Sequence, residues 1–268
     1  MGARGMISSF EDPQFWSAFA GHYHSVASLF TVSYAERAWA EASLPKDAHV
    51  VDIATGIGAL AIVAARAGAR VLATDFAAGM VERVLSLKLP NVEARKMDGQ
   101  ALDIPDASFD AAFSMFGIML FPDWQAGLSE MARVVRPGGV GSIGTWKSPR
   151  GAGTTLLLSQ IGARLYPEID YPLPWAGLVE LSDPDRLRSA MVNVGFRDVR
   201  IVEETREFLV TPDMLEAPDQ LFCFSPLWPL LGQLQRQRVV DVIREELAAR
   251  KGGLPVPSTA LIATAVRA

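Results

Sequence analysis

The sequence has one cysteine, no long apolar run and no basic cluster. Cys223 has no second cysteine to pair with among the 268 residues, so an internal disulfide and a cysteine-based metal site are excluded. No stretch of about 18 apolar residues occurs, and we expect no membrane span. A net charge of −5 without a basic stretch argues against a nucleic-acid partner. With no apolar leader at the N-terminus, we expect a protein of the cytoplasm.

Half of the residues are hydrophobic, and short apolar segments alternate with helical patterns through residues 45–146. Strands that alternate with helices indicate a parallel sheet covered on both faces. We expect five strands, 49–54, 70–75, 92–98, 109–117 and 140–146, and three intervening helices, 60–67, 77–87 and 123–135.

The regular alternation ends after Trp146. Residues 147–182 are expected to be irregular because they contain four prolines. A second irregular stretch, 211–257, is expected to contain one helix, 235–250. The remaining expected elements are a helix at 183–194 and strands at 199–210 and 259–268.

The segment VVDIATGIGALAIVAARAG, residues 50–68, places a glycine turn between an apolar run and a helical pattern. Such a turn is a common way to hold a nucleotide-type ligand at the start of a helix. GIGALA also fits the loose G-x-G-x-x-[GA] dinucleotide fingerprint. However, Asp52 lies where that fingerprint has only apolar residues, and a carboxylate there would repel a pyrophosphate.

Three acidic residues, Asp52, Asp75 and Asp98, lie at or near the ends of three successive expected strands. Ligands of open parallel sheets bind beyond the carboxyl ends of the strands. An acid after the second strand suits ribose hydroxyls, one near the first turn suits an ammonium group, and one after the third suits an adenine amine. A ligand with an adenine, a ribose and a cationic amino-acid end would use all three.

These segments resemble the motifs of the class I S-adenosylmethionine-dependent methyltransferases, within the small-molecule group that includes the ubiquinone/menaquinone methyltransferases. VVDIATGIG resembles the first motif and VLATDFAAGMV the second, while KMDGQALDIPDASFDAAFSMFGIMLFPD resembles the third and fourth. RVVRPGG before a strand is also typical of the family. The likeness covers residues 45–146 and the closing TALIATAVRA.

The resemblance implies an α/β, Rossmann-like fold with a seven-stranded, mostly parallel sheet, helices on both faces and an antiparallel last strand. It implies one methyltransferase domain over residues 1–268, with S-adenosylmethionine as cofactor and S-adenosylhomocysteine as product. Ala54 departs from the family, which usually has glycine there. We expect this small change only to tighten the backbone approach slightly.

The resemblance also implies which residues hold the cofactor, motif by motif. The first motif would surround the methionine part and Asp75 would bind the ribose. Phe76 and Met80 would pack on the adenine, whose edge the third motif would bind, and the fourth motif would border the sulfonium. The cofactor-binding residues implied are Tyr23, Asp52, Ala54, Gly56, Gly58, Asp75, Phe76, Met80, Asp98, Gly99, Gln100, Ser114, Met115 and Phe116.

Selection of the methyl acceptor is expected from a helical cap built of three variable parts, 10–42, 147–182 and 211–257. These parts are rich in aromatic residues and favour an apolar or aromatic small molecule. The same aromatics could instead pack the cap onto the core. The candidates for acceptor contact are Trp16, Phe19, Trp146, Trp175, Phe222, Phe224 and Trp228.

The sequence offers few general bases. A base is needed only where the acceptor must lose a proton, as a hydroxyl must. The candidates are His22 and His24, which point in nearly opposite directions on a helix. A surface position is the alternative interpretation of each, and His49 at the start of the first strand is interpreted as structural. The O-, N- or C-acceptor and the oligomeric state stay open, and no metal ligand cluster is found.

Three other functions compete with small-molecule methyl transfer. An NAD(P)-dependent oxidoreductase is disfavoured by Asp52 and Asp98, and by the lack of a Tyr-x-x-x-Lys pair. A cofactor-binding protein without catalysis can be distinguished from a methyltransferase only by measuring turnover. A macromolecular methyltransferase is disfavoured by the acidic charge and by SMFGIMLFPD, which replaces the N-P-P-[YF] motif used on flipped bases.

Overall fold

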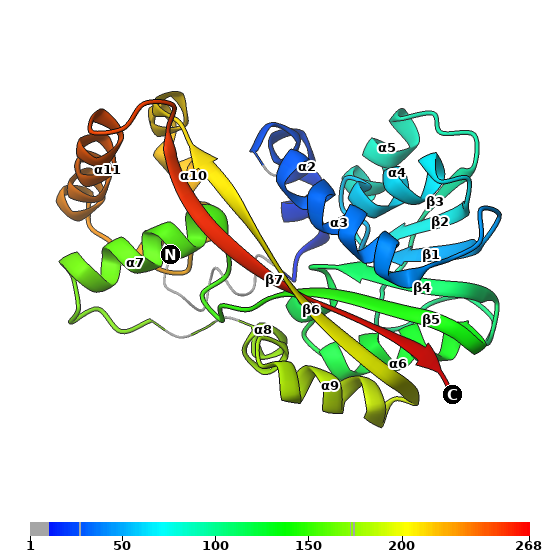
Figure 1. Ribbon diagram of the computed structural model, residues 1–268. Coiled ribbons are helices and arrows are strands. Elements are labelled where there is room, and N and C mark those ends of the chain that lie inside the picture. Colours follow the sequence, from blue (N-terminus) through cyan, green and yellow to red (C-terminus); the bar gives the residue numbers. More distant parts are fainter. Residues whose placement is uncertain (1–10, 27, 172, 174) are drawn as a thin grey trace. The chain divides into compact units, whose positions relative to one another are not determined.

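The structure, a computed structural model, describes residues 11–26, 28–171, 173 and 175–268 (Figure 1). Its described residues fall into two compact units. The larger unit contains residues 11–147, 175–204 and 260–268, and the smaller contains residues 148–171, 173 and 205–259. The interpretation of residues 1–268 as one methyltransferase domain stays a prediction.

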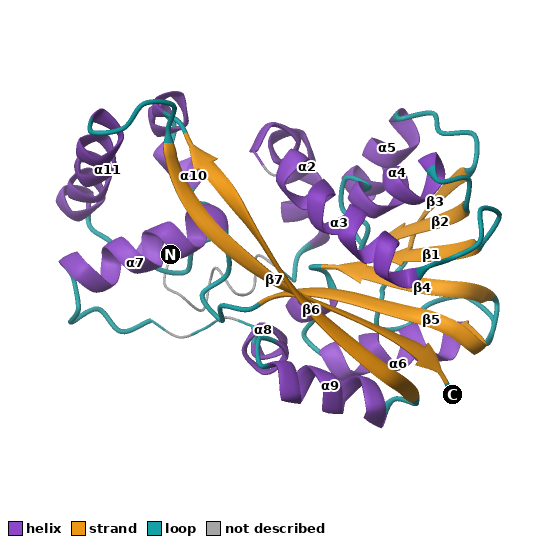
Figure 2. Ribbon diagram, viewed as in Figure 1, coloured by secondary structure: helices purple, strands orange, loops and turns teal. Residues whose placement is uncertain are grey.

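A seven-stranded sheet organises the larger unit, with strand order β3-β2-β1-β4-β5-β7-β6 (Figure 2). The pairs β1–β2, β2–β3, β1–β4 and β4–β5 are parallel, and β5–β7 is antiparallel. The expected α/β class, strand number and antiparallel last strand are therefore confirmed. The strands are β1 (His49–Ile53), β2 (Arg70–Asp75), β3 (Val92–Lys96), β4 (Phe109–Met115), β5 (Val135–Trp146), β6 (Phe196–Val210) and β7 (Leu254–Arg267).

Helices cover both faces of this sheet, as expected (Figure 1). One face carries α3 (Ser28–Ala42), α4 (Ala59–Arg66) and α5 (Ala78–Ser86), with α2 (Pro13–Val26) against α5. The other carries α6 (Trp124–Val134), α8 (Ala176–Leu181) and α9 (Pro184–Asn193). The expected N-terminal helix 10–42 is thus described as α2 and α3, while residues 10 and 27 lie outside the described residues.

Sequence patterns explain the local structure at several of these elements. Val50, Val51 and Ile53 of β1 are fully buried between the helical layers, as a continuous apolar run in a central parallel strand predicts. Each such side chain contributes about 1.5–3 kcal/mol through burial. Asp183 accepts hydrogen bonds from the N–H groups of residues 185 and 186, which makes it the N-cap of α9 with Pro184 in the first turn.

The expectation that residues 147–182 are irregular is wrong. The structure contains α7 (Gly153–Leu165) and α8 within this range. Pro149 precedes α7 and Pro167 follows it, so these prolines delimit the helix and do not interrupt it. The buried side chains Leu157, Leu158 and Ile161 supply the apolar stripe that holds α7 in its unit.

β5 begins at Val135, before the expected strand 140–146, and includes Pro137, Gly138 and Gly139. They form an irregularity within the strand, where the register against β4 shifts between the pairs Phe109–Val135 and Ala111–Val140. Gly138 has φ +77°, and a Cβ at residue 139 would lie 2.6 Å from the Asp110 carbonyl oxygen. These residues therefore form a bulge within β5.

The smaller unit is built from α7, α10 (Pro218–Leu221), α11 (Gln233–Ala248), short 3-10 turns at Pro212–Glu216 and Trp228–Leu230, and parts of β6 and β7. α11 confirms the helix expected at 235–250, and its residues Val239, Val240, Ile243 and Leu247 are buried. Phe222 and Trp228 are also buried, with ring centroids 4.8 Å apart.

Candidate functional site

The glycine turn between β1 and α4 bends through several left-handed residues. Ala54 has φ +55°, Gly56 +55° and Gly58 +89°. A Cβ at residue 56 would meet nothing within 4 Å, whereas one at residue 58 would lie 3.1 Å from Val84 Cγ2. The space over Gly56 is therefore open to a ligand, while Gly58 also serves helix packing.

Ala54 is under more strain than expected. The sequence predicts only a tighter approach, but the structure places alanine in the left-handed region, where an L-residue costs about 1–2 kcal/mol. Its methyl group fits because residue 117 is glycine: a Cβ there would lie 2.5 Å from Ala54 Cβ. The family preference for glycine at this position thus has a backbone cause.

Ala54→Gly is expected to raise the free energy of unfolding by about 0.5–1 kcal/mol, because relief of strain exceeds the entropy that glycine adds to the unfolded chain. Chemical denaturation measures this change. Ala40→Gly is the matched control, since Ala40 is exposed within α3 and the same substitution there should destabilise by about 0.5–1 kcal/mol. Destabilisation by both substitutions would contradict the strain at Ala54.

Two buried carboxylates hold the turn in place. Asp52 Oδ2 accepts hydrogen bonds from Thr55 Oγ1 at 2.6 Å and from the Ala61 N–H at 3.2 Å. Asp75, at the end of β2, accepts from the Gly56 N–H at 2.9 Å and from the Ala77 N–H at 3.0 Å. Asp52 therefore ties β1 to the start of α4, and Asp75 ties the turn to the start of α5.

Both carboxyl groups have raised pKa values. Burial raises the pKa of Asp52 from 3.8 to about 7, against the lowering effect of hydrogen bonds from Thr55 and the Ala61 N–H. Burial likewise raises the pKa of Asp75 from 3.8 to about 6, against hydrogen bonds from the N–H groups of residues 76, 77 and 56. A group that favours the charged carboxylates would therefore bind in competition with protons.

The third motif forms a tight turn after β3. The exposed Asp98 accepts hydrogen bonds from the Gln100 N–H at 2.9 Å and from Gln100 Nε2 at 3.1 Å. A Cβ at residue 99 would lie 2.9 Å from Ile53 Cγ2, so this turn packs directly against the end of β1. The structure thus brings the third motif to the same edge of the sheet as the glycine turn.

The fourth motif lies at the end of β4. The fully buried Ser114 accepts a hydrogen bond from the Ile118 N–H at 3.2 Å, which fixes the turn after the strand. Phe116 has φ +65°, an unusual value for an aromatic residue, and its N–H donates to the Gly144 carbonyl at 2.9 Å. Strained residues of this kind concentrate at functional sites.

An aromatic cluster surrounds Phe116. Its ring stacks on Trp146 with centroids 3.9 Å apart and planes 14° apart. Tyr34 meets both rings edge-on, at 5.5 Å from Phe116 and 5.3 Å from Trp146, and Phe30 stacks on Trp146 at 5.9 Å. Phe116 and Trp146 are among the site residues expected from the sequence, whereas Phe30 and Tyr34 of α3 are not. The only pattern that could have indicated Phe30 and Tyr34 is their spacing of four positions on one helix face.

The remaining predicted residues are more scattered. Trp16, Phe76 and the buried Met80 belong to a small apolar cluster, and Trp175 packs against the main core. Phe222, Phe224 and Trp228 lie in the smaller unit. The side chains of four predicted residues lie outside the described residues: Phe19, His22, Tyr23 and His24.

His49 lies at the opposite edge of the sheet. Its backbone N–H donates to Asp110 Oδ2 at 2.8 Å, and its ring lies 4.3 Å from that of Phe109. These contacts support the structural role inferred for it. Among the described residues, no group of three His, Cys, Asp or Glu side chains could hold a metal ion, and no helix has the length and apolar character needed to cross a membrane.

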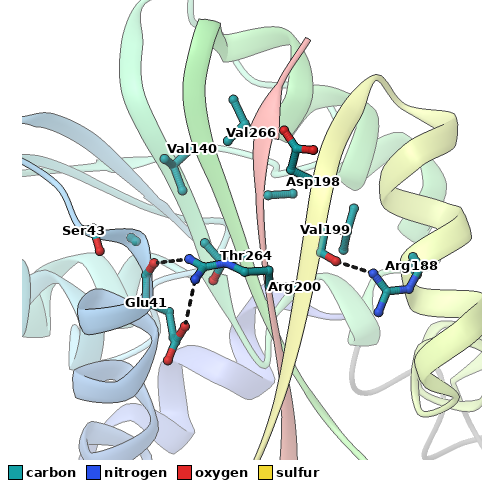
Figure 3. A pocket seen from close by; sticks show the side chains of 11 residues that line it. Glu41, Ser43, Val140, Arg188, Asp198, Val199, Arg200, Thr264 and Val266 are labelled. Atoms are coloured by element: carbon teal, nitrogen blue, oxygen red, sulfur yellow. Dashed lines mark hydrogen bonds and ion pairs between the residues drawn. The ribbon is translucent and has the colours of Figure 1, made fainter.

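A cavity of about 640 Å³ opens on the larger unit, away from the predicted site (Figure 3). Val140 lines this cavity and pairs with Ala111 of β4, which in turn pairs with Val50 of β1. The cavity therefore lies near the amino end of β1 and not at the carboxyl edge that carries the predicted site. Arg200 crosses the cavity to donate to the Glu41 carbonyl at 3.0 Å. The lining residues are Glu41, Ala42, Ser43, Val140, Arg188, Asp198, Val199, Arg200, Thr264, Ala265 and Val266.

The residues at the carboxyl edge fit S-adenosylmethionine. The Asp75 carboxylate accepts backbone N–H groups of residues 56, 76 and 77, and a carboxylate has about four acceptor positions, so capacity remains for a further donor such as a ribose hydroxyl. The open space over Gly56 lies directly beside this carboxylate, because the Gly56 N–H donates to it. A nucleoside could therefore lie against the turn without displacing a side chain from residue 56.

A family model described as a methyltransferase domain matches residues 50–139. The match begins in β1, includes the glycine turn, Asp75 and the third and fourth motifs, and ends in β5. This segment is therefore similar to a methyltransferase domain. The resemblance drawn from the sequence is thereby confirmed, and the methyltransferase domain contains the glycine turn and both buried carboxylates.

Curated relatives match between 37% and 59% of this chain. A demethylmenaquinone methyltransferase of Corynebacterium kroppenstedtii is 39% identical over 100 residues, 37% of this chain and 42% of the relative. An uncharacterized protein of Mycobacterium tuberculosis is 33% identical over 110 residues, 40% of each chain. The UbiE ubiquinone/menaquinone biosynthesis C-methyltransferase of Geobacter sulfurreducens is 29% identical over 177 residues, 59% of this chain and 68% of that protein.

Solved structures share the fold of the methyltransferase domain at low sequence identity. A phosphoethanolamine N-methyltransferase 2 of Haemonchus contortus, solved with S-adenosylhomocysteine, has a TM-score of 0.54 and 18% identity over 88% of this chain and 52% of that chain. The YcgJ protein of Bacillus subtilis has a TM-score of 0.55 and 15% identity over 89% of this chain and 98% of its own. Similarity at this level supports the Rossmann-like fold alone.

Proposed function

We propose that this protein transfers a methyl group from S-adenosylmethionine to a small apolar or aromatic molecule. The observation that carries the proposal is the carboxyl edge of the sheet, where Asp75, the open turn at Gly56 and the strained Phe116 lie on adjacent strand ends. The methyltransferase domain match and the relatives named as quinone methyltransferases support the same activity.

In this proposal each strand end holds one part of the cofactor. Asp75 accepts hydrogen bonds from the ribose hydroxyls, and Asp98, Gly99 and Gln100 border the adenine. Asp52 keeps the turn closed around the methionine part through Thr55 and Ala61. The bound cofactor supplies a methyl group on a positively charged sulfur, so the protein contributes chiefly binding and orientation.

The aromatic cluster supports a flat or apolar acceptor. Trp146 ends β5 and is partly buried, whereas Phe116 directly follows β4 and is buried. Stacked aromatic rings at a strand end offer a surface on which a second flat molecule gains about 0.5–1.5 kcal/mol per ring pair beyond its buried area. The cluster is uncharged, which favours an apolar acceptor over a phosphorylated one.

Isothermal titration with S-adenosylhomocysteine, NAD and NADP tests the cofactor. Binding of S-adenosylhomocysteine alone supports the proposal, whereas binding of a nicotinamide cofactor would assign the glycine turn to a dinucleotide. Transfer of a labelled methyl group from S-adenosylmethionine to a panel of phenols, quinols and apolar amines then tests catalysis. Cofactor binding without transfer to any of them would indicate a binding protein that lacks turnover.

The affinity for S-adenosylhomocysteine is expected to fall as the pH is lowered through about 7 and about 6, the raised pKa values of Asp52 and Asp75. The ligand favours the charged carboxylates, so below each pKa a proton must first leave, and binding weakens up to about tenfold per pH unit for each group. Titration from pH 8 to pH 5 measures this, with Asp52→Asn as the control that should reduce the slope. A pH-independent affinity would contradict it.

A further inference from the structure

The first helix of the larger unit lies against the predicted adenine side of the site. Its residues Trp16 and Ala20 pack in a small apolar cluster with Ile57 of the glycine turn and with Ala77 and Met80 at the start of α5. This cluster is separate from the main core under the sheet. Phe76, which directly follows Asp75, packs against the same cluster.

Close backbone contact fixes α2 at this place. The Gly79 N–H donates to Ser17 Oγ at 3.1 Å, and Ser17 Oγ in turn donates to the Pro13 carbonyl at 2.8 Å. A Cβ at residue 79 would lie 2.7 Å from the Ser17 carbonyl oxygen and 2.8 Å from Ser17 Cα. Only glycine at residue 79 therefore lets the backbone of α2 come this near to α5.

The same cluster is coupled to the ribose carboxylate. Asp75 accepts hydrogen bonds from the N–H groups of Gly56 and Ala77. Gly56 directly precedes Ile57, a residue of the cluster, and Ala77 belongs to the cluster itself. The turn that would hold the ribose and the surface that carries Trp16 thus share their supporting residues. An adenine joined to a ribose on Asp75 would extend from this carboxylate toward Phe76 and the cluster.

We propose that Trp16 of α2 forms one wall of the adenine site. The inference rests on the proposed function and changes one of its assignments, since sequence analysis grouped Trp16 with the residues that contact the acceptor. An indole offers a flat apolar surface to an adenine, and stacking of a base on an aromatic side chain strengthens binding by about tenfold. Gly79 is a positioning residue, because it acts only through the placement of α2.

Gly79→Ala and Trp16→Leu test the proposal by isothermal titration with S-adenosylhomocysteine and by competition with adenosine. Each variant should bind both ligands about tenfold more weakly, because both ligands carry the adenine. Trp16→Phe should recover most of the affinity, since it keeps a flat ring. Thermal unfolding of each variant near that of the unmodified protein checks that the sheet is intact.

The outcomes separate this proposal from the proposed function. If the unmodified protein binds no S-adenosylhomocysteine, the proposed function fails first. If it does bind, and both variants retain affinity within twofold for both ligands, Trp16 is not a wall of the adenine site. If Trp16→Leu weakens S-adenosylhomocysteine but leaves adenosine unchanged, Trp16 faces the amino-acid end and the adenine assignment is overturned. Ser17→Ala, which removes the two hydrogen bonds of Ser17 Oγ but adds no Cβ between the two helices, is the mild variant should Gly79→Ala fail to fold.

Discussion

Asp75→Ala is expected to weaken the binding of S-adenosylhomocysteine by about 1–3 kcal/mol, the usual contribution of hydrogen bonds to a charged acceptor. Two losses combine in this variant. The ribose loses its acceptor, and the Gly56 and Ala77 N–H groups lose the carboxylate that joins the turn to α5. Isothermal titration at pH 8 measures the change, because the carboxylate of the unmodified protein is then fully charged.

Two further variants make the result specific. Asp75→Asn keeps the size of the side chain and one carbonyl oxygen, so it should lose less affinity than alanine. Asp185→Ala is the control for removal of an acid, because Asp185 lies in the first turn of α9 on the other face of the sheet and is exposed. An affinity of folded Asp75→Ala equal to that of the control would remove Asp75 from the site.

Tyr34→Ala is expected to lower the free energy of unfolding by about 3–5 kcal/mol, the range for removal of a buried aromatic side chain. Tyr34 is fully buried and meets Phe30, Phe116 and Trp146 edge-on. Its loss leaves a cavity among three rings and removes contacts that hold Phe116 in its left-handed conformation. Urea denaturation measures the stability.

Tyr34→Phe is the matched control, since it keeps the ring and removes only the hydroxyl. It should cost no more than about 1–1.5 kcal/mol, the contribution of one hydrogen bond. Losses of similar size in both variants would mean that the hydroxyl and not the ring stabilises the fold. A loss below about 1 kcal/mol for Tyr34→Ala would show that the aromatic cluster contributes little.

Much of the sheet could be predicted because parallel strands are buried on both faces and have continuous apolar runs. All seven expected strands exist, and the expected helix 183–194 agrees within one residue at each end because Asp183 and Gly195 mark its limits. Helix α7 was missed because prolines near it suggested irregular chain. The contacts that would have corrected this, such as those of Leu158, are long-range and leave no local pattern.

The motifs of the candidate site could be predicted from the sequence, but the residues that hold these motifs in place could not. Acids and glycines at strand ends have a fixed spacing along the chain, so Asp52, Gly56 and Asp75 were found. Tyr34 and Gly79 matter through partners that are distant in sequence, Phe116 and Ser17. The left-handed backbone at Ala54 was likewise hidden, because sequence shows which residue is present but not the φ angle it adopts.

The strand order delays the pairing of β6 during synthesis. Within the sheet, β7 lies between β5 and β6, although β6 leaves the ribosome first. At about 5–20 residues per second, several seconds pass before β7 exists and β6 can join the sheet. During that interval its apolar residues would offer neighbouring chains a strand to pair with. The exposed residues Arg197, Arg200 and Glu203 place charges on β6, and these discourage aggregation of the nascent chain.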